Sequence, residues 1–197
     1  PLHFICLVVL LSFVYIAWDN LGSPHPVAFW VAVAIPIMHQ VFVWLSWRLE
    51  LQSSIMSRAI GFRAYLIIFF SLLVGRVIAV SVLAWLDQGS LNVPVLPMVI
   101  ALAILCPIWL YTAYSVRRFF GLSRAAGADH FDPAYRQLPL VDQGVFRFNN
   151  NAMYFFGFLL FWIIGIGCKS EAAIIVAAFG HIYVWVHYQS TEKPDME

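Results

Sequence analysis

Six long, uninterrupted apolar segments restrict what this chain can fold into. A helix needs about 20 apolar residues to cross the hydrocarbon core of a bilayer. The segments lack the alternation of polar and apolar residues that a membrane barrel requires, so we expect helices. The sequence therefore predicts an all-α integral membrane protein with about six transmembrane helices. The six segments are Leu2–Trp18, Val27–Trp47, Ala64–Leu86, Val95–Val116, Ala152–Cys168 and Ala172–Tyr188.

The supply of charged residues supports a lipid environment. Only 11% of the residues are charged and 62% are hydrophobic, whereas a soluble domain carries roughly 25% charged residues. We expect one membrane domain over residues 1–197, in which residues 1–94 have no readable role. The net charge of +1 and the lack of a basic tract give no sign of a nucleic-acid partner. The cysteines lack metal-ligand spacing, so no metal site is predicted. The sequence does not indicate an oligomeric state.

The positive charges predict the orientation in the membrane. With six crossings, all but two of the lysines and arginines fall on one side, which is expected to be cytoplasmic. Both termini are then cytoplasmic. Because the sequence begins at Pro1 rather than methionine and stops on a charged stretch, we expect residues to be missing at both ends.

Two polar stretches are predicted to meet on the cytoplasmic side. The linker Arg117–Asn151 is longer than a connection requires, and its recurring aromatic residues argue against disorder. The tail Gln189–Glu197 returns to the same face, because the link Lys169–Glu171 makes the last two helices a tight hairpin. We expect a cofactor pocket where the linker and the tail meet.

The C-terminal half carries a series of motifs in a characteristic order. It resembles the membrane methyltransferases that use S-adenosylmethionine, namely isoprenylcysteine carboxyl methyltransferases and phosphatidylethanolamine N-methyltransferases. The resemblance covers roughly residues 110–197 and weakly favours the phospholipid branch. It rests on Arg117-Arg118, AAGADHF (125–131), LVDQGVF (140–146), NNAMYFFG (150–157), the hairpin and TEKPDME (191–197).

The chain departs from the family pattern at three places. Asn151-Ala152 stands where the family has a proline after the polar residue, and Gly157 comes one position late after Tyr154. The acidic pair is reduced to Glu192-Lys193. These departures keep a degenerate, non-catalytic member open as an alternative.

The resemblance implies transfer of a methyl group from S-adenosylmethionine to a membrane lipid or another apolar acceptor. Catalytic candidates are His130 and Glu192, as bases for an amine acceptor, and Tyr154. The candidate cofactor-binding residues are Gly127, Asn150, Asn151, Tyr154, Gly157 and Glu192.

The physical reasons differ among these candidates. Glu192 suits the positive charges of the donor, and a helix start capped by asparagines suits its carboxylate. Gly127 permits a tight bend over the site. Plainer readings stay open: the asparagines as a cap alone, Tyr154 as an interfacial anchor and His130 as a solvated loop residue.

Arg76 is predicted to contact the substrate, because it falls near the middle of the third segment. A charge costs several kcal/mol there unless it is paired, and its partner is a lipid phosphate, a carboxylate or a buried structural group. Two further functions stay open. One is a b-type cytochrome or quinone-linked electron carrier with haem held by His39 and His181, and the other is a nicotinamide-dependent membrane reductase.

Overall fold

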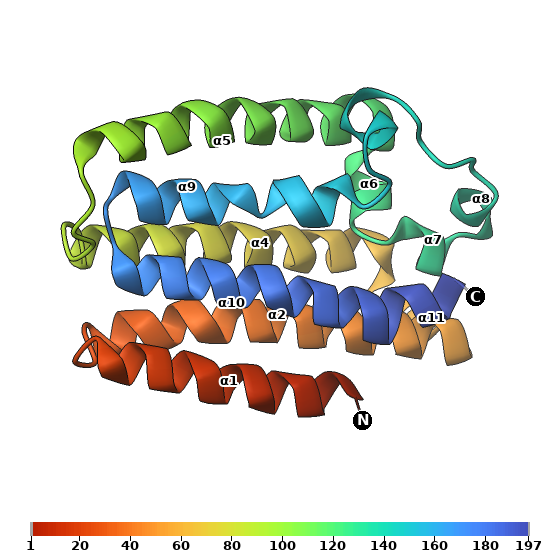
Figure 1. The fold of residues 1–197 in the computed structure, drawn as a ribbon. Coiled ribbons are helices and arrows are strands. Elements are labelled where there is room, and N and C mark those ends of the chain that lie inside the picture. Colours follow the sequence, from red (N-terminus) through yellow and green to blue (C-terminus); the bar gives the residue numbers. More distant parts are fainter. Residues whose placement is uncertain (1, 197) are drawn as a thin grey trace.

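The computed structural model describes residues 2–196, and over these residues the chain is a bundle of helices without strands (Figure 1). The six expected segments all form helices at about the expected positions. The α-helices at these positions are α1 (Leu2–Asn20), α2 (Pro26–Ser53), α4 (Gly61–Leu86), α5 (Val95–Ser115), α9 (Leu159–Gly167) and α10 (Glu171–His187).

Within residues 2–196, five helices are long and apolar enough to cross a membrane, one fewer than the expected six. Two of them are extended by π-helical turns, α5 by η1 (Val116–Phe120) and α10 by η4 (Tyr188–Glu192). The segment expected at Ala152–Cys168 is shorter, because it begins with the π-helical turn η3 (Met153–Gly157) before α9. Runs of this length and apolarity make the chain an integral membrane protein.

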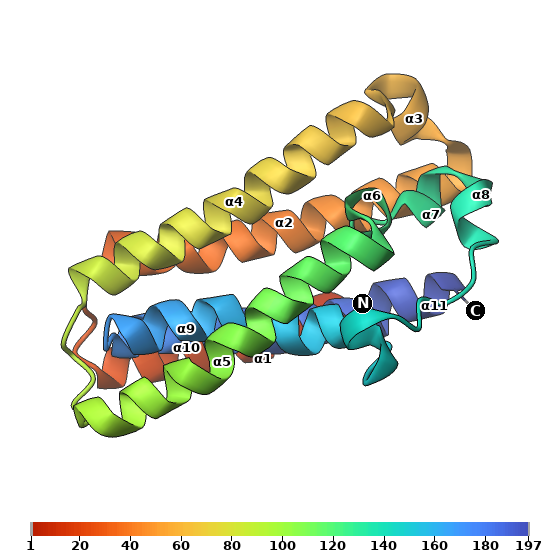
Figure 2. The same cartoon turned by 90° about the horizontal axis from the view of Figure 1, so that it is seen from above.

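The connections divide between the two ends of the bundle (Figures 1 and 2). One end carries the short links that follow α1, α4 and α9. The other end carries the polar linker and the tail, so these two stretches lie at the same end of the bundle, as predicted (Figures 1 and 2). That this end is cytoplasmic stays a prediction. The remaining short helices at that end are α3 (Ile55–Ala59), α6 (Leu122–Ala125), α7 (Ala128–Phe131), α8 (Pro133–Arg136), η2 (Gly144–Arg147) and α11 (Lys193–Met196).

The hairpin of α9 and α10 is fastened to the rest of the bundle by Asp87, at the end of α4. One carboxylate oxygen of Asp87 accepts hydrogen bonds from the hydroxyls of Ser90 (2.8 Å) and Ser170 (2.6 Å) and from the backbone N–H of Ala172 (3.0 Å). Gly165 allows the two helices to approach closely, because a Cβ there would lie 3.0 Å from Ile174. These contacts therefore fix the position of the hairpin along the axis of the bundle relative to α4.

The main core lies between α1, α2, α4 and α10, where the side chains of Phe29, Leu83, Phe179 and Tyr183 are fully or almost fully buried. Helix α5 stands at the edge and buries only Thr112 and Ser115 of its own residues. It packs on α9, on η3 and on η2 rather than on α4. The space between α4 and α5 is therefore not closed by direct packing of these helices.

Candidate active site

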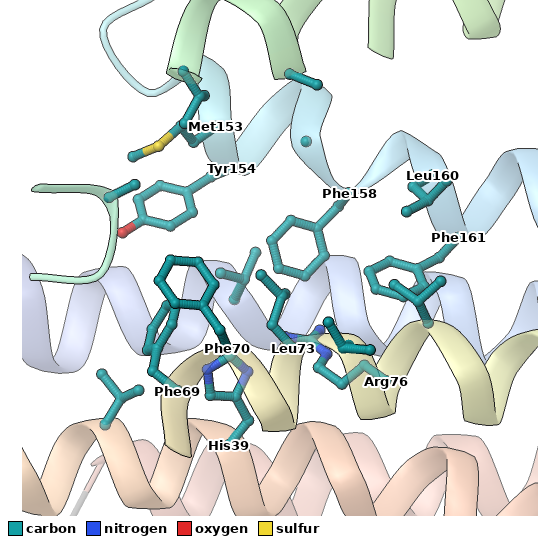
Figure 3. Close-up of a pocket in the computed structure, with 18 of the residues that line it drawn as sticks. His39, Phe69, Phe70, Leu73, Arg76, Met153, Tyr154, Phe158, Leu160 and Phe161 are labelled. Carbon is teal, nitrogen blue, oxygen red and sulfur yellow. The ribbon is translucent and has the colours of Figure 1, made fainter. Parts of the chain in front are cut away.

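A cavity of about 440 Å³ lies within the bundle, between α2, α4, α5, α10 and the segment η3–α9 (Figure 3). Its volume falls in the range of small-molecule sites. Its wall is largely aromatic, with the side chains of Trp47, Phe69, Phe70, Trp109, Tyr154, Phe158 and Phe161. The polar side chains in the wall are those of His39, Gln40, Arg76, Thr112 and His187. Among the described residues, no carboxylate lines it.

Tyr154 and Glu192 are brought together, although they are far apart in the sequence. The Tyr154 hydroxyl donates a hydrogen bond to Oε2 of Glu192. Tyr154 and Gly157 both line the cavity from the π-helical turn η3. The aromatic rings of Trp185 and Tyr188 lie 5.9 and 5.5 Å from the Tyr154 ring. The pair thus places a carboxylate beside the cavity where η3 meets the tail.

Gly127 and His130 both lie on the indole ring of Trp47, a wall residue that the sequence did not single out. The His130 ring stacks on the indole at 3.9 Å between centroids, with 12° between the planes. Gly127 has φ +83°, and a Cβ added there would approach the indole to 2.4 Å. A residue with a side chain is excluded by both the backbone and the contact. The linker is therefore pressed onto the end of α2.

Tyr65 fixes this arrangement from α4. Its buried hydroxyl accepts a hydrogen bond from Nε1 of Trp47 (3.0 Å) and donates one to the carbonyl of Ala126 (2.8 Å). Tyr65 and Ala126 are fully buried. One hydroxyl thus ties together α2, α4 and the linker.

Asp129 contacts the imidazole of His130 at Nδ1, while the face of the ring stacks on Trp47. Its carboxylate lies 3.2 Å from Nδ1 of His130. Burial favours a raised pKa for Asp129, but the hydrogen bond and charge of His130, together with the charge of Arg124, outweigh it and lower this pKa below its ordinary value. The carboxylate is consequently ionised at neutral pH and orients the ring.

Asn150 and Asn151 lie outside the cavity wall. The backbone N–H of Asn151 donates to Oδ1 of Asn149 (2.8 Å), which forms a local turn before η3. The first turn of η3 itself has no side-chain cap, so among the described residues only Asn149 makes a local side-chain contact in this run. A role of Asn150 and Asn151 toward a cofactor stays a prediction.

Arg76 and His39 line the cavity, and both are buried, with exposed fractions of 3% and 4%. Within the described chain, Nε of Arg76 and both ring nitrogens of His39 have no hydrogen-bond partner. His181, by contrast, accepts a hydrogen bond from Trp162 (3.1 Å) and is not part of the wall. The two histidines considered for haem therefore do not face one cavity.

Two polar residues near the tail were missed by the sequence reasoning. His187 lines the cavity, and both of its ring nitrogens lack a partner in the described part of the chain, as does the hydroxyl of Thr191. Their spacing of four residues places them on one face of a helix. This spacing could have indicated a polar helix face, but the sequence alone does not say whether that face points toward the interior of the bundle.

Comparison with known proteins gives one finding. A family model described as phospholipid methyltransferase matches residues 97–197. No curated protein and no solved structure matches the chain. The matched region contains Gly127, His130, Tyr154 and Glu192, whereas His39, Trp47, Tyr65 and Arg76 lie before it.

Proposed function

The chain belongs to the phospholipid methyltransferase family, and on this premise we propose that it transfers a methyl group from S-adenosylmethionine to a membrane lipid. Family membership supports a membrane methyltransferase that acts on lipid. The donor, the acceptor and the roles of individual residues are parts of the proposal. The contact between Tyr154 and Glu192 beside the aromatic cavity is the observation that carries it.

The residues at the polar end fit the chemistry of this donor. Its sulfonium and ammonium are positive, and the Glu192 carboxylate provides the matching negative charge beside a cavity whose described lining holds no carboxylate. His187 lines the cavity, and its ring nitrogens, which have no partner among the described residues, offer hydrogen-bonding positions for a polar ligand. Aromatic side chains of the wall suit an adenine or a methylated ammonium.

The donor, when bound, supplies an activated methyl group that an acceptor attacks directly. The protein then contributes mainly by orienting the two reactants and excluding water. Tyr154 orients the Glu192 carboxylate through its hydroxyl. His130 is held by Asp129 and by the indole of Trp47 but is not itself in the cavity wall, so its role as the base for an amine acceptor stays a prediction.

We place the two entrances at different sides of the cavity. The acceptor enters from the bilayer between α4 and α5, which have little direct contact with each other. The donor enters from the polar end, where the linker and the tail meet. This end carries most of the arginines, so it faces the cytoplasm in our proposal.

Donor binding and methyl transfer can be tested with one matched pair of variants. Calorimetry with S-adenosylmethionine should show binding to the wild-type protein and to Glu171→Gln, which changes a carboxylate at the opposite end of the bundle. Binding should be at least tenfold weaker in Glu192→Gln, because a charge-assisted contact contributes about 1.5–3 kcal/mol. Membranes incubated with isotope-labelled donor should yield a labelled lipid.

The absence of donor binding to the wild type would refute the proposal. The remaining alternatives, a reductase, a cytochrome and a scaffold, can then be distinguished by different measurements. A nicotinamide cofactor would raise the thermal midpoint of a reductase, and a Soret band would identify a cytochrome. A protein that responds to none of these ligands would fit a scaffold.

A further inference from the structure

Arg76 presents an unbalanced positive charge to the inner part of the cavity. No described residue forms a hydrogen bond or an ion pair with its guanidinium, and no described carboxylate lines the cavity. Burying a charge in this way is costly unless something compensates it. The compensation is therefore expected from a ligand.

The surrounding side chains hold the guanidinium in place without neutralising it. The rings of Phe158 and Phe161 lie 5.0 and 5.3 Å from its central carbon. On the other side a Cβ at Gly180 would lie 3.3 Å from one terminal nitrogen, so α10 approaches the guanidinium closely. The group is thus clamped between α9 and α10 while its Nε–H remains unused.

His39 adds a second unused polar group to the same part of the cavity. Its ring packs edge-on against Phe69 at 4.6 Å, and neither nitrogen is satisfied within the described residues. Figure 3 shows His39 on α2 and Arg76 on α4 on the same side of the cavity, facing Phe158, which lies between η3 and α9. A guanidinium and an imidazole together provide several donors, which match an oxyanion with more than one acceptor oxygen.

We infer that Arg76 and His39 form an oxyanion subsite, which takes a phosphate or carboxylate group carried by an amphipathic ligand. Both residues lie before the region that the family model matches, so the N-terminal helices supply this selectivity. The inference rests on the proposed function only in identifying this ligand as the methyl acceptor. The aromatic wall beyond the subsite receives the rest of the ligand.

The subsite is tested by binding alone, without a methyl donor. The probes are dodecyl phosphate, dodecanoate, dodecanol and inorganic phosphate, added to the purified protein in a neutral detergent. The two alkyl anions should bind the wild type and the matched control Arg63→Gln, an exposed arginine on the same helix. Binding to Arg76→Gln should be roughly 10- to 100-fold weaker, as expected for a lost charge-assisted hydrogen bond. Dodecanol should bind all three proteins equally.

The arms of this experiment distinguish the sources of the oxyanion. Competition by inorganic phosphate would assign the subsite to free phosphate as well as to lipid, and its absence would assign it to lipid-borne anions. Equal affinity of the alkyl anions for wild type and Arg76→Gln would overturn the inference, and so would binding of dodecanol as tight as that of dodecyl phosphate.

A structural role for Arg76 predicts a different result. If the guanidinium serves a ligand, Arg76→Gln should raise the thermal midpoint of the ligand-free protein by a few degrees, because an uncompensated buried charge is removed. A structural arginine would lower it. Arg76→Lys keeps the charge without the planar fork, so it should bind dodecyl phosphate with intermediate affinity. Because none of these measurements uses S-adenosylmethionine, failure of the subsite and failure of methyl transfer remain distinguishable.

Discussion

The hydroxyl of Tyr65 offers the sharpest test of how the linker is held over the site. The substitution Tyr65→Phe removes one oxygen atom and leaves two buried groups without a partner, Nε1 of Trp47 and the carbonyl of Ala126. Each unsatisfied group costs about 1–3 kcal/mol. We expect a loss near the lower end of the sum, about 2 kcal/mol, because the linker lies at an end of the bundle where water can replace part of the bonding.

The loss should appear as local opening of the linker, which proteolysis detects. Arg124 precedes Ala126 by two residues and provides a tryptic site. When opening is fast relative to cleavage, the cleavage rate follows the population of the open form. A loss of 2 kcal/mol then predicts cleavage roughly 30-fold faster in Tyr65→Phe. The control Tyr15→Phe alters an exposed tyrosine on α1 and should leave the rate unchanged. An unchanged rate in Tyr65→Phe would refute the role given to this hydroxyl.

The remaining predictions concern Gly127, Asp87 and the Tyr154–Glu192 pair. Gly127→Ala should lower the thermal midpoint more than Gly22→Ala, since both glycines have positive φ but only Gly127 faces an indole at contact distance; equal losses would show that the contact is relieved at no cost. Asp87→Ala should destabilise the protein by about 2–4 kcal/mol in denaturant unfolding, because three donors, of which those of Ser170 and Ala172 are buried, lose their acceptor, and Asp87→Asn should lose less. For donor binding, Tyr154→Phe and Glu192→Gln should be non-additive by about 0.5–3 kcal/mol in a double-mutant cycle, and strict additivity would argue against their acting as one unit.

Local patterns in the sequence were enough to predict the helices and the position of the site. The apolar runs located all six helical segments, and the counting of crossings placed the linker and the tail at one end. The order of motifs led to Tyr154 and Glu192, which the fold brings into contact. These features depend on composition and on chain order, which a single sequence records directly.

Contacts between distant segments were beyond such reasoning. Tyr65 bonds to Ala126, and Asp87 bonds to Ser170. These contacts join segments far apart in the sequence, and only the packing of the helices decides which segments lie side by side. For the same reason the partner of Gly127 was not foreseen, although the need for a glycine was. Asn150 and Asn151 illustrate the converse. Their capping signal is local, and it does not reveal whether their side chains face the cavity.

The shortness of the segment from Met153 to Gly167 has a consequence for the membrane itself. The five residues of η3, Phe158 and the nine residues of α9 rise about 22 Å, whereas the hydrocarbon layer is about 30 Å thick. Such a mismatch is relieved by thinning of the nearby leaflet or by water that follows the polar chain inward. Tyr154 would then sit at the floor of an indentation in the bilayer surface, where a solute from the aqueous phase and a lipid that never leaves its leaflet can meet.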